Sequence, residues 1–69
     1  MRYERLRIQR VSPERMMSVI DFRIPSGLFL TKECRKWVAV DNSTGDAWTE
    51  EFRWRHQAVR WLRGKFAVE

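Results

Sequence analysis

One cysteine and one histidine are the residues of this chain best suited to chemistry. Cys34 and His56 supply fewer soft ligands than a structural zinc site needs. Cys34 also has no second cysteine for an internal disulfide, and no histidine is held beside it by spacing to act as a base. We therefore expect Cys34 to be a small apolar side chain in a reducing compartment and His56 to be a surface residue.

Carboxylates and glycines give no catalytic motif either. Glu50 and Glu51 are adjacent, and neighbours on a strand point to opposite faces, so they cannot face one another as an acid and base pair. Gly27, Gly45 and Gly64 are too far apart in sequence for a phosphate loop. We expect a non-catalytic protein without cofactor or metal that works by binding a partner.

Basic residues concentrate at both ends of the chain. Residues 1–15 hold five Arg against two Glu, residues 53–69 hold five basic residues against one Glu, and the middle holds four basic against six acidic residues, for a net charge of +5. Such a surface favours polyanions through counterion release, and an acidic protein surface fits it equally well. The candidate binding residues are Arg5, Arg7, Arg10, Arg23, Arg35, Lys36, Trp37, Arg53, Arg60 and Arg63.

A β-hairpin is the clearest predicted element. The segments KWVAV and DAWTEEF flank DNSTGD, a cluster of turn residues. With Gly45 supplying a positive φ, the predicted register places Val40 opposite Trp48. Trp37 then lies on the mixed face of the hairpin, partly exposed beside Arg35 and Lys36, where it can stack on a base or anchor a protein interface.

A helix is predicted over residues 53–64, because the hydrophobic period changes after the hairpin. Gly64 is well placed to end it. Its apolar side holds Trp54, Ala58, Trp61 and Leu62. We expect this side to pack on the hairpin, which makes Trp54 and Trp61 part of the core. Its polar side holds Arg53, His56, Gln57, Arg60 and Arg63.

The alternation of Ile20, Phe22 and Ile24 predicts a further strand, stopped by Pro25, so that an antiparallel sheet spans residues 18–52. A short helix over residues 13–19 remains an alternative, since Ser12 and Pro13 make a fair helix start.

The basic N-terminal segment, residues 1–15, admits two readings. Leu6 and Ile8 alternate with polar residues, which fits an edge strand or an arm that orders on binding. The segment GLFLTKEC contains a turn or an extra short strand. The predicted fold is therefore α+β: one domain over residues 1–69, with a three- or four-stranded antiparallel sheet and one C-terminal helix packed on one face.

The chain has no apolar run near the ~18 residues that a membrane span requires. Met1 leads into RYERLRIQR, which lacks the apolar core of a signal peptide. We expect a cytoplasmic protein that makes no membrane contact. An exposed hairpin edge could also pair with the same edge of a second copy to form a symmetric homodimer.

The order KWVAV, turn, GDAW, Phe52 and a helix carrying Ala58 and Trp61 resembles the three-stranded-sheet-plus-helix DNA-binding domains. These include the plant ethylene-response-factor type and the arm-binding domains of phage integrases. The resemblance covers residues 18–64 in element order and residues 36–61 in pattern. It implies that the sheet enters the major groove of DNA.

The positions that the resemblance carries over to DNA reading are Arg23, Arg35 and Trp37. Asp41 and Glu51 share or border the same face, and much of the positive charge lies on the helix instead. Both features depart from the pattern of those domains.

Two functions follow as hypotheses. The first is a nucleic-acid-binding module from a phage or other mobile element, using Trp37 with Arg35 and Lys36 and supported by the N-terminal arm. The alternative is a protein-binding module, such as a small inhibitor of the anti-defence or anti-CRISPR type or an adaptor. That module would dock on a larger enzyme through Trp37, Phe29 and the Arg-rich helix.

Overall fold

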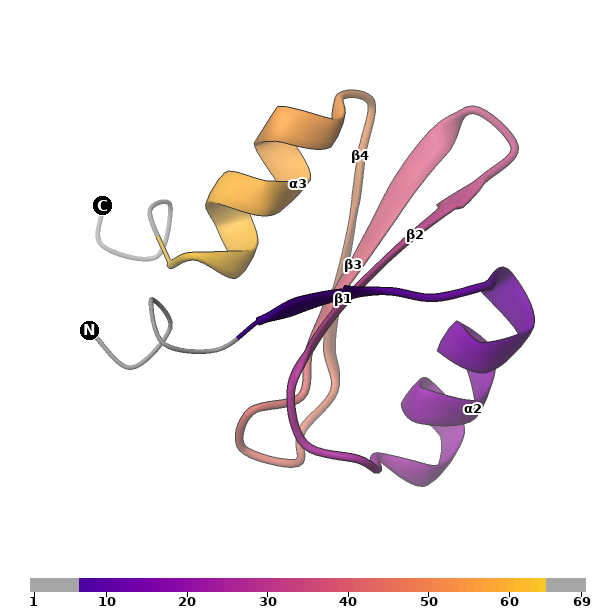
Figure 1. Cartoon of the computed structure of the whole chain (residues 1–69), viewed down its shortest axis with the longest axis vertical. Coiled ribbons are helices and arrows are strands. Elements are labelled where there is room, and N and C mark those ends of the chain that lie inside the picture. Colours follow the sequence, from indigo (N-terminus) through magenta and orange to yellow (C-terminus); the bar gives the residue numbers. More distant parts are fainter. Residues whose placement is uncertain (1–6, 65–69) are drawn as a thin grey trace.

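Four strands form one mixed sheet in the order β1-β2-β3-β4 (Figure 1). The computed structural model describes residues 7–64. Its elements are β1 (Ile8–Arg10), α2 (Pro13–Phe22), β2 (Leu28–Glu33), β3 (Lys36–Asp41), β4 (Trp48–Phe52) and α3 (Arg55–Leu62). The predicted α+β class is confirmed.

The sequence predicts a purely antiparallel sheet, but the observed sheet is mixed. β1 runs parallel to β2, with Ile8 beside Leu28 and Arg10 beside Leu30, while β2, β3 and β4 pair antiparallel. A parallel neighbour requires a crossover, and α2 provides it. Ile8 thus belongs to an edge strand; Leu6 and Arg5 lie outside the described residues.

The helix reading of residues 13–19 is confirmed and extends to Phe22. The Ser12 side chain accepts a hydrogen bond from the Arg15 backbone N–H at 3.1 Å, and Pro13 occupies the first turn. The helix ends at Arg23, whose φ of 59° is left-handed. These are the capping features that favour helix entry and exit.

The strand predicted around residues 20–24 was therefore wrong. Ile20 and Phe22 lie on the last turn of α2. Met16 and Val19 are buried, and Ile20 packs beside them, which is a helical stripe that outweighs the short alternation. The strand that neighbours β3 is instead β2, from the segment GLFLTKEC, joined to β3 through a turn at Cys34 and Arg35.

The register of the β3–β4 hairpin differs from the prediction by one residue. Val40 pairs with Thr49, and Asp41 pairs with Trp48. Ala47 adopts a positive φ of 50° and donates its N–H to the Asn42 side chain at 3.1 Å, which adds one residue to the loop. A one-residue shift exchanges the two faces of a strand, so Trp48 does not share the face of the buried Val40, and it is 63% exposed.

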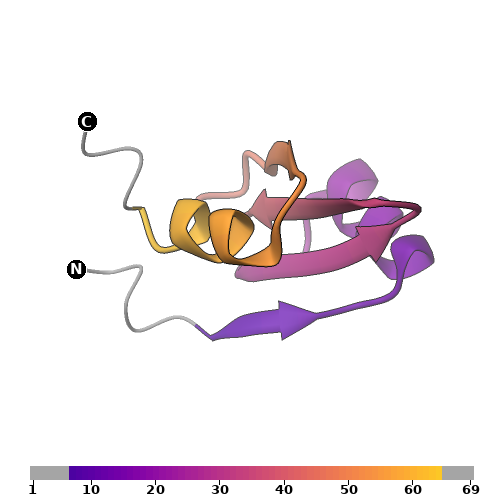
Figure 2. The same cartoon turned by 90° about the horizontal axis from the view of Figure 1, so that it is seen from above.

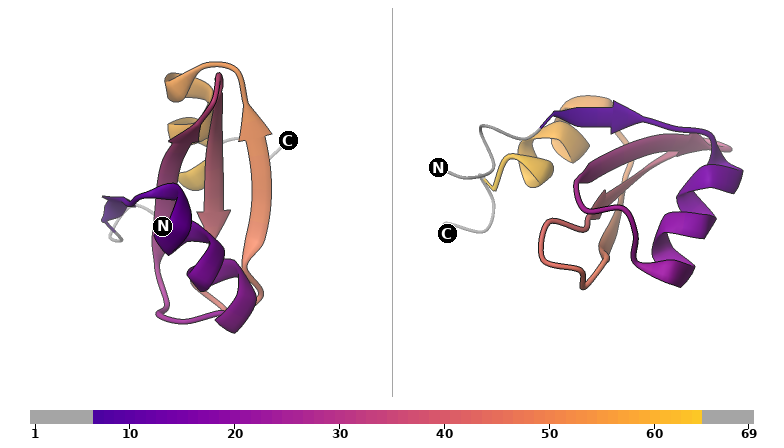
Figure 3. Two further views of the ribbon diagram at one scale, coloured as in Figure 1. Left: turned by 90° about the vertical axis from the view of Figure 1, so that its right-hand side faces the viewer. Right: turned by 60° about the horizontal axis from the view of Figure 1, so that its bottom comes forward.

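Each face of the sheet carries a helix, whereas one helix on one face had been predicted. Figure 2 shows α3 and α2 at opposite ends of the molecule with the strands between them, and Figure 3 (left) shows α2 in front of the sheet and α3 behind it. The core on the α3 side comprises Leu28, Leu30, Ala39, Ala58 and Leu62. The core on the α2 side comprises Met16, Val19, Phe29 and Val40.

This arrangement removes two residues from their predicted roles. Phe29 is 1% exposed, so it cannot anchor a docking partner. Trp54 precedes α3 and is 53% exposed, so it is not part of the core. Its backbone N–H donates a hydrogen bond to Gln57 Oε1 at 3.4 Å. Trp61 does pack as predicted, with its ring centroid 5.9 Å from that of Phe52.

Candidate nucleic-acid interface

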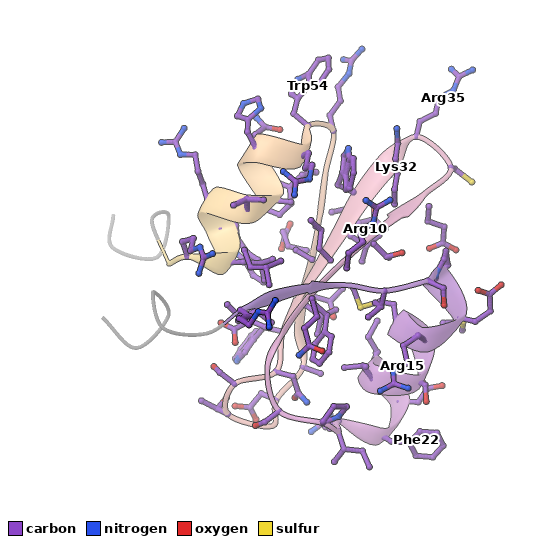
Figure 4. All side chains as sticks on the ribbon, in the orientation of Figure 1. Arg10, Arg15, Phe22, Lys32, Arg35 and Trp54 are labelled. Carbon is purple, nitrogen blue, oxygen red and sulfur yellow. The ribbon has the colours of Figure 1, made fainter. Side chains whose placement is uncertain are left out.

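Trp37 is surrounded by three cations on the α3 side of the sheet. The guanidinium carbon of Arg10 lies 5.0 Å from the ring centroid, the Lys32 Nζ 5.4 Å and the guanidinium carbon of Arg55 6.0 Å. We call these four residues the Trp37 cluster. In the view of Figure 4, Arg10 and Lys32 both overlap the β2–β3 hairpin.

The sheet brings these residues together from separate parts of the chain. Lys32 on β2 is the antiparallel partner of Trp37 on β3. Arg10 on β1 is paired with Leu30, two residues before Lys32 and therefore on the same face. Arg55 enters from the first turn of α3, which packs over that face.

The ring holds cations that would otherwise repel one another. A cation–π contact at an exposed site contributes only about 0.5–1 kcal/mol. Three cations lie within 6.0 Å of the centroid of one half-buried ring, so each has two like charges near it. A bound anion would relieve this repulsion, which makes the cluster a suitable anion site.

A groove between β1 and α3 adjoins the Trp37 cluster. Its volume is about 330 Å³, and it is lined by four arginines, Arg7, Arg10, Arg55 and Arg63, and by three apolar residues, Ile8, Leu30 and Val59. We call it the arginine groove. Among the described residues, its lining includes no acidic side chain.

Guanidinium groups suit one anion in particular. Their planar fork of N–H donors matches the oxygens of a phosphate and binds them with two parallel hydrogen bonds. Arg10 and Arg55 belong to both the Trp37 cluster and the arginine groove. The two sites therefore form one continuous surface, which we call the basic face.

A second, larger depression lies at the tip of the β2–β3 hairpin. It measures about 450 Å³ and is lined by Arg35, Lys36, Glu51, Phe52 and Arg53. Lys36 Nζ lies 3.2 Å from Glu51 Oε1, so part of its positive charge is paired. This depression is larger than the arginine groove but, unlike the described lining of that groove, includes an acidic side chain.

The predicted site residues divide among these places. Arg7, Arg10, Trp37 and Arg63 meet on the basic face. Arg35, Lys36 and Arg53 line the depression at the hairpin tip. Arg23 ends α2 on the other side of the sheet, Arg60 lies on α3, and Arg5 lies outside the described residues.

Lys36 does not share a surface with Trp37, although the two are adjacent in sequence. Trp37 faces α3, whereas Lys36 points to the α2 side, where its strand neighbour on that face is Val38. Alternation along a strand separates such neighbours. The predicted trio of Arg35, Lys36 and Trp37 is therefore not a single patch.

Lys32 and Arg55 were not among the residues predicted from the sequence. A signal for Lys32 exists: LFLTKE and KWVAVD are strands of equal length around a two-residue turn, which places Lys32 opposite Trp37. The sequence gives a weaker signal for Arg55. The helical projection does not group it with the other arginines, and no nearby residue indicates that the first turn of α3 reaches Trp37.

No protein-family model, curated protein or solved structure gives a significant match to this chain. The resemblance to three-stranded-sheet-plus-helix DNA-binding domains stays a prediction. In the structure α2 packs over the sheet face opposite α3.

Two further observations concern residues 7–64 alone. This part of the chain brings no three potential metal ligands of the His, Cys, Asp or Glu types together. Neither α2 nor α3 has the length and apolar character needed to cross a bilayer.

Proposed function

We propose that this protein is a small non-catalytic nucleic-acid-binding protein that holds phosphate groups on its basic face. One observation carries the proposal: four arginines line one groove, and two of them, Arg10 and Arg55, share Trp37 with Lys32. Five cations thus converge on one side of a sheet from β1, β2, α3 and their flanks.

Phosphate contacts are the main mode of binding in this proposal. Three cations lie within 6.0 Å of the Trp37 ring centroid, so in this proposal Trp37 positions them and does not itself stack on a base. Phosphate contacts fix position and carry no sequence code. Binding is therefore expected to tolerate many sequences and to weaken steeply with salt.

The test is a titration of labelled oligonucleotides with Arg10→Ala and Arg55→Ala at several salt concentrations. Each variant should weaken binding roughly ten- to a hundredfold at low salt, as expected for one charge-assisted hydrogen bond of about 1.5–3 kcal/mol. Each should also lower the slope of log affinity against log salt by about 0.7–0.9.

Arg15→Ala is the matched control, because Arg15 is an exposed arginine on α2, away from the basic face (Figure 4). It removes the same charge and should leave affinity nearly unchanged. Equal losses in all three variants would contradict a defined site and leave only the effect of net charge.

An acidic protein surface is the second candidate partner. The α2 side carries apolar side chains that a phosphate backbone would not use: Phe22 is 69% exposed, Ile24 67% and Met17 63%. Exposed apolar groups of this kind favour protein contact. Absence of nucleic-acid binding near physiological salt would make this candidate the leading one.

A further inference from the structure

The lining of the arginine groove is partly apolar, which phosphate binding alone does not explain. Ile8 and Val59 are half-buried and Leu30 is buried, and all three line the groove between its arginines. A site for phosphate alone would gain more from polar groups at its base. The apolar part of the lining instead suits a flat apolar group bound beside the arginines.

We infer that the arginine groove takes one unpaired nucleotide of a single-stranded nucleic acid. Its base would lie on Ile8 and Val59 and its flanking phosphates on Arg10 and Arg55. The inference rests on the proposed function and deepens it, because it names the form of nucleic acid. Guanidinium planes and apolar side chains both pack against the faces of unpaired bases.

The size of the groove agrees with this occupant. Small-molecule sites usually measure about 300–1,000 Å³, and the arginine groove, at about 330 Å³, lies at the lower limit. That is room for one planar group. A duplex keeps its base faces stacked inside, so a duplex bound to the same arginines would leave the apolar part of the lining uncovered.

The experiment compares three ligands at near-physiological salt: a labelled single strand of mixed sequence, an abasic strand of the same length, and the duplex of the first strand. The abasic strand has the same phosphates and no bases. The single strand should bind roughly five- to a hundredfold more tightly than the abasic strand, the range that base contacts supply. DNA and RNA versions of the single strand distinguish the two sources of this ligand.

Val59→Thr tests the apolar part of the lining itself, because it keeps the shape of the side chain and adds a hydroxyl. It should reduce the preference for the base-bearing strand while leaving the affinity for the abasic strand unchanged. Val11→Thr, the same substitution at a half-buried site in the α2-side cluster, is the control. The thermal unfolding midpoint of each variant shows whether it folds.

The outcomes separate the two proposals. Equal binding of single strand and abasic strand, or tighter binding of the duplex, would overturn the single-strand inference and leave phosphate binding intact. No binding of any ligand, or binding insensitive to Arg10→Ala and Arg55→Ala, would overturn the proposed function itself. The ligand comparison uses the unaltered chain, so it stands even if Val59→Thr fails to fold.

Discussion

Asn42 is a fully buried polar residue that joins two loops at one end of the sheet. Its Nδ2 donates to the Pro25 carbonyl oxygen at 2.8 Å, and its Oδ1 accepts from the Ala47 N–H at 3.1 Å. Its backbone exchanges hydrogen bonds with Gly27 at 3.2 and 2.8 Å. A single side chain thus fixes both the entry to β2 and the length of the β3–β4 loop.

Asn42→Ala should lower the free energy of unfolding by about 2–4 kcal/mol, because it leaves the Pro25 carbonyl and the Ala47 N–H without their partner. Asn42→Asp should also destabilise, since it keeps the acceptor and loses the donor. Urea denaturation measures both. Thr44→Ala, at an exposed position in the same loop, should change stability by less than about 0.5 kcal/mol. An Asn42→Ala variant as stable as this control would refute the role.

Among the elements, α3 connects stability to the candidate site. Ala58 and Leu62 have no exposed surface and dock the helix on Leu28, Leu30 and Ala39. The same helix carries Arg55 to Trp37. The helix has eight residues, too few to be stable without this packing.

Leu62→Ala should therefore destabilise the fold by about 2–5 kcal/mol, the usual range for a buried Leu-to-Ala change. Denaturation followed by tryptophan fluorescence measures the loss. His56→Ala, on the exposed side of α3, is the control and should have little effect. Stability equal to that of the unaltered chain would show that α3 does not need this contact.

Local signals in the sequence predicted the elements that depend on local chemistry. The Ser12 cap with Pro13, the turn residues around Gly45 and the end of α3 near Gly64 all lie within a few positions of the structure they determine. The strand predicted around residues 20–24 was wrong because the helical spacing of Met16, Val19 and Ile20 outweighs the short alternation. The hairpin register was wrong because Ala47 takes a positive φ that its residue type does not announce.

The candidate site was harder to predict, for a physical reason. Arg10 and Trp37 were named, yet their meeting depends on the parallel pairing of β1 with β2. A parallel register is set by how α2 packs across the sheet and has no turn that marks it in the sequence. Arg55 likewise joins the cluster only through the tertiary docking of α3.

At the scale of the whole molecule, β4 is an open edge of the sheet. Among residues 7–64 it pairs only with β3, and its centre carries Glu50 and Glu51, both exposed. Two such edges brought together antiparallel would place like charges opposite one another, which opposes pairing. These carboxylates thus protect an edge that also exposes Trp48.

Replacing both acids, as Glu50→Gln with Glu51→Gln, should promote self-association, seen as an increased mass in sedimentation equilibrium. The loss of the exposed Lys36–Glu51 salt bridge should itself matter little. Glu14→Gln with Asp21→Asn on α2 is the control, because it makes the same change in net charge away from the edge. Association of both double variants alike would attribute the effect to net charge.

The basic face draws on both ends of the described chain, since Arg10 lies in the first strand and Arg55 in the last helix. Synthesis on the ribosome delivers these residues in that order, and α3 can dock only after the sheet beneath it has been made. A partly synthesised chain therefore holds Arg10 and Trp37 without Arg55. Under the proposed function, full affinity for nucleic acid therefore arises only after α3 has been synthesised and has docked on the sheet.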